Sequence, residues 1–294
     1  QLSGLNSTTL RALETTDIQA LTTTQVSQLT TTNLSNLTTD QVQVLKTDQI
    51  QALTSVQLAG LNSTTLQALT TTQVQALKTT QVSQLSASNL NSLTTAEVQA
   101  LTTDQIKVLT STQLRGLSST NLQALETTDV QALTTTQVSL LSTSNLNNLT
   151  TVQVQALTTT QVKAISTTSL SGLSTASVQA LTTDQIQALT TTQLRAFSAT
   201  NLQAIETTDI QALTTTQVSQ LTTANVANLT TDQVQSVTTT QIQALTSVQL
   251  VGLKSATLQA LTTTQVQALT TKQVSQLSTS NLNNLTTADV QALT

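Results

Sequence analysis

Apolar residues recur along the chain with a strict period of eight, a unit that we call the octad. Every eighth residue from Leu2 to Val290 is Leu, Val or Ile, which gives 37 positions. Every eighth residue from Leu5 to Leu293 gives 37 more, all Leu except Ile165, Phe197, Ile205 and Val237. A disordered chain does not keep so many positions free of polar residues, so both sets predict a core.

The octad reads V/L/I-Q-A-L-T-T-T/D-Q, and its phase is kept from Leu2 to Thr294. Constant phase predicts equivalent octads in a single continuous solenoid over residues 1–294. One long helix fails, because eight residues at about 100° each shift the apolar stripe by about 80° per octad. One strand also fails, because its two apolar positions would face opposite sides. The chain must therefore turn once per octad.

A short capped helix fits each octad, as residues 21–30 illustrate. With Thr22 as the N-cap, Gln25 falls at N3 and closes a capping box, while Leu21 and Val26 form a hydrophobic staple. The next cap then begins at Thr30. This pattern predicts an all-α solenoid of short capped helices, one per octad.

The cap can alternatively lie one residue later. That later position is Ser or Thr in 34 of 36 octads, the exceptions being Ala87 and Ala199. The earlier position admits residues that cap poorly, namely Glu14, Lys46, Lys78, Glu126, Glu206 and Lys254. Both registers stay open from the sequence.

A β-solenoid is the alternative fold, favoured by the high Thr and Val content. Tight β corners usually need Gly or Asn, yet the chain has 5 glycines. All of them occupy the third octad position, which is normally Ala: Gly4, Gly60, Gly116, Gly172 and Gly252. We interpret this position as a small-residue packing site and not as a turn.

A longer period of seven octads is superimposed on the octad. Successive glycines are spaced by seven, seven, seven and ten octads, and the matching asparagines by seven, seven, ten and seven: Asn33, Asn89, Asn145, Asn225 and Asn281. Two solenoid coils of about three and a half octads would explain these blocks. Block duplication without geometric meaning explains them equally, and the excess of three octads in one block suggests three octads per coil.

Composition excludes most chemistry. The 294 residues include no His or Cys, so the commonest general base, the thiolate nucleophile and the main zinc ligands are absent. The net charge is −4 and the nine basic residues are scattered, which disfavours nucleic acid and anionic lipid as partners. Thr, Ser, Gln and Asn fill the polar positions, so we expect neutral groups to face solvent. We expect no enzyme, cofactor, metal site or membrane insertion, and assign no catalytic or binding residue.

Three acidic pairs stand out: Glu14 with Asp17, Glu126 with Asp129, and Glu206 with Asp209. Each pair supplies too few oxygens for calcium, so we expect solvent-facing charges at helix starts.

We interpret the remaining candidate positions as ordinary surface or core residues. Arg11, Arg115 and Arg195 share the second octad position and predict surface solubility, with Arg11 in reach of Glu14. Val56, Val152 and Val248 recur every twelve octads as a candidate lateral contact, and Phe197 fills a Leu site.

Rows of threonine suggest a flat face for ice or glycans, although helix caps alone would require them. Asn6, Asn33 and Asn36 match the N-glycosylation pattern, which arises by chance in an Asn- and Thr-rich chain.

The Leu-Thr-Thr-Asp-Gln-Ile-Gln-Ala-Leu segment at 181–189, with variants at 37–45 and 101–109, resembles Thr/Gln-rich short-repeat regions of large bacterial surface and secreted proteins of the adhesin or fibre type. This resemblance implies a structural extracellular or cell-surface role. Because the octads begin and stop in mid-phase, we expect end-to-end or lateral self-association, or a place within a longer array. The predicted function is a rod, stalk or fibre, and the alternative is a Thr-rich module that binds ice or glycans.

Overall fold

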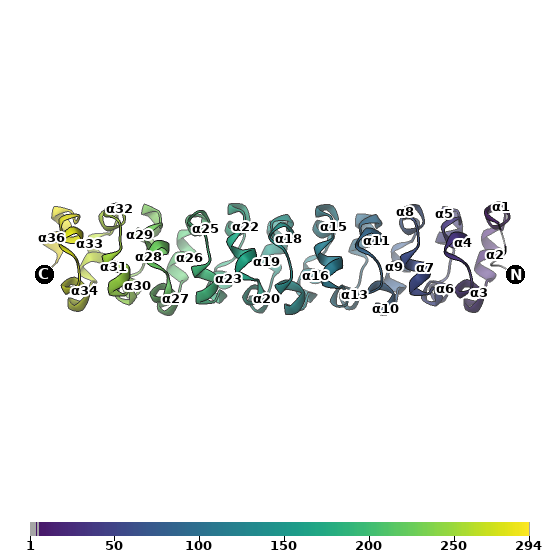
Figure 1. Ribbon diagram of the computed structural model, residues 1–294, viewed down its shortest axis with the longest axis horizontal. Helices are drawn as coiled ribbons and strands as arrows, with labels where there is room; N and C mark the ends of the chain where they lie inside the picture. Colours follow the sequence, from purple (N-terminus) through teal and green to yellow (C-terminus); the bar gives the residue numbers. More distant parts are fainter. Residues whose placement is uncertain (1–3, 5, 294) are drawn as a thin grey trace. The chain divides into compact units, whose positions relative to one another are not determined.

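The computed structural model describes residues 4 and 6–293, and within these residues the chain forms 36 short helices and no strand (Figure 1). The all-α prediction is therefore confirmed, and the β-solenoid alternative is wrong. The predicted core residues Leu2 and Leu5 lie outside the described residues.

The first eighteen helices are α1 (Ser7–Arg11), α2 (Thr15–Ala20), α3 (Thr23–Ser27), α4 (Thr31–Ser35), α5 (Thr39–Gln43), α6 (Thr47–Ala52), α7 (Ser55–Ala59), α8 (Ser63–Gln67), α9 (Thr71–Ala76), α10 (Thr79–Val82), α11 (Ala87–Ser92), α12 (Thr95–Gln99), α13 (Thr103–Lys107), α14 (Ser111–Arg115), α15 (Ser119–Ala124), α16 (Thr127–Ala132), α17 (Thr135–Ser139) and α18 (Thr143–Asn148).

The others are α19 (Thr151–Ala156), α20 (Thr159–Ala164), α21 (Thr167–Ser171), α22 (Thr175–Gln179), α23 (Thr183–Ala188), α24 (Thr191–Arg195), α25 (Ala199–Ala204), α26 (Thr207–Ala212), α27 (Thr215–Gln220), α28 (Thr223–Ala227), α29 (Thr231–Ser236), α30 (Thr239–Ala244), α31 (Ser247–Val251), α32 (Ser255–Gln259), α33 (Thr263–Gln267), α34 (Thr271–Ser275), α35 (Thr279–Asn283) and α36 (Thr287–Ala292).

The helix caps follow the first of the two registers. At α3, the Thr22 hydroxyl accepts from the N–H of Gln25 at 3.2 Å, and Gln25 Oε1 accepts from the N–H of Thr22 at 2.8 Å. The later position, Thr23, is the first helical residue, so the alternative register is wrong. Lys46 occupies an N-cap without an acceptor atom, but its own N–H still donates to Gln49 Oε1 at 2.7 Å. Where the N-cap side chain cannot accept a hydrogen bond, the bond from the N-cap N–H to the N3 side chain therefore keeps the helix start in the same register.

The links between helices use extended backbone. Leu53 (φ −59°, ψ 132°) is the C-cap of α6, and Thr54 (φ −73°, ψ 156°) is the N-cap of α7. No described residue has a positive φ. Such a corner needs no glycine, which explains how the chain turns once per octad with so few of them.

Glycine instead allows two helices to approach each other closely. A Cβ added to Gly116 would lie 2.6 Å from Ala87 Cβ, and one added to Gly172 would lie 2.8 Å from Thr143 Cγ2. Gly60 and Gly252 meet the methyl groups of Thr31 and Thr223 in the same way. The small-residue interpretation is confirmed at these four sites. It is wrong at Gly4, where an added Cβ meets no atom within 4 Å.

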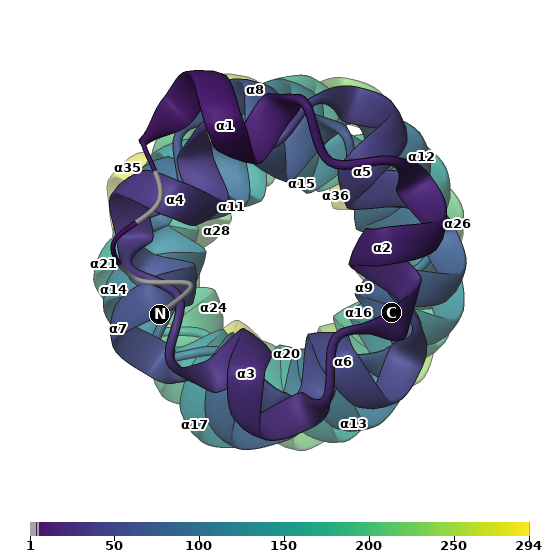
Figure 2. The ribbon, with the colours of Figure 1, turned by 90° about the vertical axis from the view of Figure 1, so that its right-hand side faces the viewer.

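The chain divides into two compact units. Unit 1 comprises Gln1–Leu141 with Asn148–Ala156, and unit 2 comprises Ser142–Asn147 with Leu157–Thr294. Within each unit, a helix packs against the helix three octads further on, as α3 packs on α6 in unit 1 and α27 packs on α30 in unit 2. In unit 1, Figure 2 shows α1, α2, α3 and α4 following one another around a turn before α5 returns beside α1 and α2. We call each such turn a coil.

The apolar octad positions form the core of each unit, as predicted. Ile18, Val74, Ile186 and most of their equivalents are fully buried, and Phe197 fills its Leu position at 4% exposure. The prediction is wrong near the C-terminal end of unit 2, where Leu282 and Val290 are 40% and 52% exposed. No following coil of the described residues covers them.

Candidate functional site

From α4 to α36, the N3 position of each helix carries a buried polar side chain, whereas the N3 residues of α1, α2 and α3 are exposed. The N3 glutamines from Gln41 to Gln273 are only 1–6% exposed. The expectation that polar positions face solvent is therefore wrong for this row, which we call the N3 row. A buried amide must find hydrogen-bond partners, and the partners of these glutamines define the most regular site in each unit.

Gln57 illustrates the arrangement, which we call the clasp. Its Oε1 accepts from the N–H of Thr54 at 2.7 Å, which closes the cap of its own helix α7. Its Nε2 donates to the carbonyl oxygens of Val26 at 3.0 Å and Leu29 at 2.6 Å, in the preceding coil. One side chain therefore caps its own helix and bonds two coils together.

The same two donations, to the residues 31 and 28 positions earlier, recur through both units. In unit 1 they are made by Gln41, Gln49, Gln57, Gln73, Gln81, Gln105, Gln113, Gln137 and Gln153. In unit 2 they are made by Gln193, Gln217, Gln233, Gln241, Gln249, Gln265 and Gln273.

The accepting carbonyls lie where each helix ends. Leu29 follows α3, and its carbonyl belongs to the group that a helix leaves without an internal partner. The clasp supplies that partner from the next coil. The offset of 28 residues between Gln57 and Leu29 is three and a half octads, which agrees with the two-coil interpretation of the seven-octad period.

Asparagine in the N3 row makes a shorter version of the clasp. Asn121 Nδ2 donates to Leu90 O at 2.7 Å but lies 3.4 Å from Leu93 O. Asn201 does the reverse and donates to Leu173 O at 2.7 Å. One methylene fewer leaves a side chain that reaches one carbonyl closely and not both.

Acidic residues in the N3 row bring no amide donor. Asp129 Oδ2 caps its own helix α16 by accepting from the N–H of Glu126 at 3.1 Å, whereas Asp209 Oδ1 accepts from the hydroxyl of Thr183 in α23, 26 residues earlier, at 2.7 Å. Asp129 and Asp209 are buried, so the expectation of solvent-facing pairs is wrong for these two; their partners Glu126 and Glu206 are exposed. In the pair at 14 and 17, both side chains are exposed as expected.

Burial raises the pKa of the Asp129 carboxyl. The hydrogen bond from the Glu126 backbone acts in the opposite direction, and the negative charge of Glu126 raises the pKa further.

Surface charges form few pairs. Arg11 Nε donates to the carbonyl oxygen of Asn36 at 2.9 Å, a partner other than the predicted Glu14. The ion pair found among the described residues joins Lys107 to Asp104 at 3.2 Å, with both side chains at least half exposed. An exposed pair of this kind stabilises by at most about 1 kcal/mol.

The remaining sequence candidates are three exposed valines and the asparagines of the glycosylation pattern. Val56, Val152 and Val248 are 77%, 61% and 73% exposed. Asn33 is buried and its Oδ1 accepts from Thr30, so its glycosylation pattern is a chance match. Asn6 is an N-cap whose Oδ1 accepts from the N–H of Thr9 at 2.9 Å.

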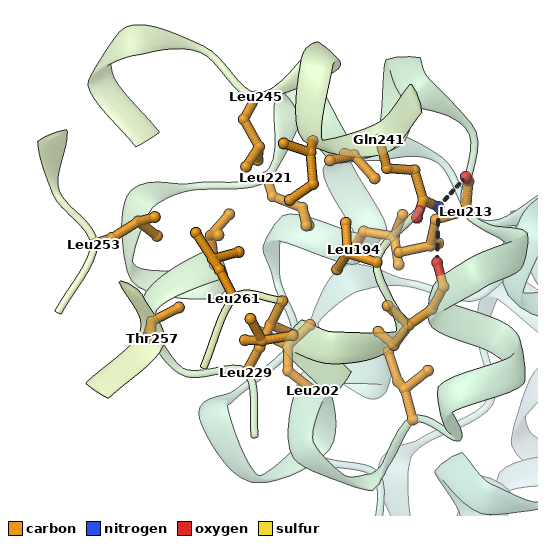
Figure 3. Close-up of a pocket in the computed structure, with 17 residues that line it drawn as sticks. Leu194, Leu202, Leu213, Leu221, Leu229, Gln241, Leu245, Leu253, Thr257 and Leu261 are labelled. Atoms are coloured by element: carbon orange, nitrogen blue, oxygen red, sulfur yellow. Dashed lines mark hydrogen bonds between the residues drawn. The ribbon is translucent and has the colours of Figure 1, made fainter. Parts of the chain in front are cut away.

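A cavity of about 30 Å³ lies in unit 2 (Figure 3). Leucines such as Leu194, Leu221 and Leu261 line it, and Gln241 at its edge is already engaged with the carbonyls of Ile210 and Leu213 at 2.9 and 2.7 Å. Such a volume holds about one water molecule, and an apolar lining gives water no partners. The cavity is a packing void and too small for a substrate.

Neither a metal-ligand cluster nor a membrane-spanning helix occurs in the described part of the chain. Its residues contain no group of three or more acidic side chains placed to hold a metal ion. Within the same residues, no helix has the length and apolar character needed to cross a bilayer.

The family model described as the ALTTAQ repeat matches eight stretches of the chain, which together cover well over half of it. They are residues 1–31, 28–55, 87–119, 122–159, 159–191, 191–223, 202–239 and 242–279. No curated protein matched the chain.

Proposed function

The chain belongs to the ALTTAQ repeat family, and on that premise we propose that it is a structural repeat protein that builds a rod, stalk or self-assembling fibre outside the cell, at the cell surface. The row of clasps carries this proposal. Each coil receives the same pair of bonds from the next, as Gln105 bonds to Val74 and Leu77 in unit 1 and Gln265 bonds to Val234 and Val237 in unit 2. Repeats joined only to their neighbours can extend by adding identical coils.

Clasp groups that have no coil partner among the described residues support self-association. In unit 1, Gln25 of α3 is exposed, and the described residues give its Nε2 no carbonyl partner. In unit 2, the carbonyls of Val274 and Leu277 receive no clasp from the described residues. A hollow of about 300 Å³ beside Val274 has a mixed lining of apolar residues such as Val266 and polar residues such as Gln267. A coil of a second copy would supply the groups that these ends need, as would further octads of a longer array.

The experiment is sedimentation and electron microscopy of residues 1–294 over a range of concentrations. We expect particles that lengthen with concentration and that keep a helical far-UV circular dichroism spectrum. The variant Gln25→Glu keeps the capping oxygen but removes the amide donor, so it should weaken association at least tenfold. Gln28→Glu makes the same charge change at an exposed C-cap and should associate like the parent. A monomer at all concentrations, or equal association of both variants, contradicts the assembly proposal.

The location is tested separately on intact source cells. A membrane-impermeant amine reagent should label exposed lysines such as Lys46 and Lys107 if the protein is at the cell surface. Labelling only after lysis contradicts an extracellular role and leaves the assembly proposal standing.

Exposed threonines support a second candidate, binding of ice or glycans. Thr23 and Thr24 are exposed at N1 and N2 of α3, and equivalent residues repeat on other helices. Thermal hysteresis or glycan affinity that disappears when one row is changed from Thr to Tyr would favour this candidate. If the parent chain shows neither thermal hysteresis nor glycan affinity, this candidate is excluded.

A further inference from the structure

Glu97 is the one member of the N3 row that has the length of glutamine and the charge of an acid. It lies at N3 of α12, where it is 3% exposed. Its Oε2 accepts from the N–H of Thr94 at 2.6 Å and from the Thr94 hydroxyl at 2.9 Å. These bonds repeat the capping half of a clasp.

The second carboxyl oxygen has no partner. Glu97 Oε1 is the one buried side-chain nitrogen or oxygen in the described part of the chain that lacks a hydrogen bond. A buried unpaired oxygen is costly, and more so when it carries charge.

The repeat identifies what this oxygen faces. In the next octad, Gln105 uses its Nε2 to bond the carbonyls of Val74 and Leu77, 31 and 28 residues earlier. The same offsets from Glu97 lead to Leu66 and Leu69, both buried. An ionised carboxylate would place a negative oxygen against two carbonyl oxygens, where every clasp glutamine places a donor.

We propose that Glu97 is a pH-operated clasp: the protonated carboxyl donates its O–H to the carbonyl of Leu66 or Leu69 and closes the contact between adjacent coils, and ionisation opens it. A carboxylic acid supplies the one donor that an ionised carboxylate lacks. The device sits within unit 1 and does not depend on self-association.

The helices that pack most extensively against α12 carry no charge that would offset ionisation. These helices are α9 and α15, and neither contains an acidic or basic residue, nor does α8, which carries Leu66. The charged residues nearest to them in sequence are Lys78 and Glu126, which follow the C-caps of α9 and α15 and are both exposed. Glu97 is the only charged residue of α12 itself. Burial raises the pKa of Glu97, and the hydrogen bonds from the Thr94 backbone and hydroxyl act in the opposite direction.

The sign of the pH effect follows from that raised pKa. The folded chain holds the proton to a higher pH than the unfolded chain, so the clasp stabilises unit 1 at low pH and is lost as pH rises through the folded-state pKa. Between the ordinary glutamate pKa and the raised one, the equilibrium constant for opening should rise about tenfold per pH unit.

The test compares the parent chain with Glu97→Gln, which restores the residue found in most octads and should fold. Hydrogen exchange of the α8 and α12 amides, corrected for intrinsic rates, should show opening that increases with pH in the parent relative to the variant. Infrared difference spectra between the two should show a protonated carboxylic acid band in the parent that disappears over the same pH range. Glu14→Gln, at an exposed N-cap, should follow the parent.

Two results overturn the proposal. One is a parent-to-variant difference in exchange that stays constant with pH. The other is a set of infrared spectra in which Glu97 is ionised at every pH at which exposed glutamates are ionised.

Discussion

Gln57 Nε2 lies 2.6 Å from the carbonyl oxygen of Leu29, 28 residues earlier in the chain. Because this separation is a half-integral number of octads, the clasp of one coil meets the end of a helix in the preceding coil and not another clasp. Helix ends carry unpaired carbonyls, so the half-octad stagger places each donor where an acceptor is needed.

Removing a clasp should destabilise unit 1. Gln73→Ala deletes donations to Val42 and Leu45, both at 2.8 Å, and the acceptor for the Thr70 N–H. Leaving these buried groups unpaired should lower the free energy of unfolding by about 1–3 kcal/mol in urea denaturation. Gln75→Ala, on the exposed face of the same helix α9, should change it by less than about 0.5 kcal/mol. Equal effects of the two variants would contradict the clasp.

Removing a cap should have a smaller, local effect. Thr70→Ala deletes the hydroxyl that accepts from the N–H of Gln73 at 3.2 Å and should cost about 1 kcal/mol in the same measurement. Thr71→Ala, one residue later at N1, tests the alternative register and should be close to neutral. The reverse order of effects would mean that the cap lies at Thr71.

Adding a methyl group at a packing glycine should destabilise the contact between coils. Gly60→Ala drives a Cβ into the methyl group of Thr31, and overpacking of this kind costs about 1–3 kcal/mol. Thr31→Ser removes that methyl group and should restore part of the loss in the double variant. Gly4→Ala meets no neighbour and should be tolerated. Thermal unfolding of these chains measures the coupling, and simple additivity of the changes at 60 and 31 would refute direct contact.

Neutralising a buried acid in the N3 row should stabilise the protein at neutral pH. Asp129→Asn removes a carboxylate whose pKa is raised mainly by burial. The gain should be present at pH 7 and shrink on acidification, because the parent carboxyl then takes up a proton and is neutral too. Asp184→Asn, at an exposed position of α23, provides the control. A gain that is independent of pH would contradict the burial effect.

Much of the fold could be predicted because it is local. The period of eight, the short helices and the capping box of Thr22 with Gln25 depend on residues within one octad, where spacing along the chain determines spacing in the structure. Ambiguity at Lys46 arose because its side chain cannot cap, whereas the structure keeps the register through the reciprocal bond to Gln49.

The clasp was missed because its other half is remote in sequence. The capping box accounts for Oε1 of Gln25 and its equivalents, but the partners of Nε2 depend on the number of octads per coil, which the glycine spacing leaves open. One signal was available: the N3 row holds neutral amides, small hydroxyls and acids but never Lys or Arg, a restriction that a solvent-facing row would not need.

Each clasp reaches back by no more than about four octads, since Gln57 bonds to residues 31 and 28 positions before it. During synthesis, an octad can therefore be bonded to its predecessors soon after it emerges, without waiting for the distant end of the chain. The separation between bonded residues stays constant as octads are added, so relative contact order falls as the array lengthens. A growing nascent chain can advance its folded boundary coil by coil, with only the most recent coil exposing its core.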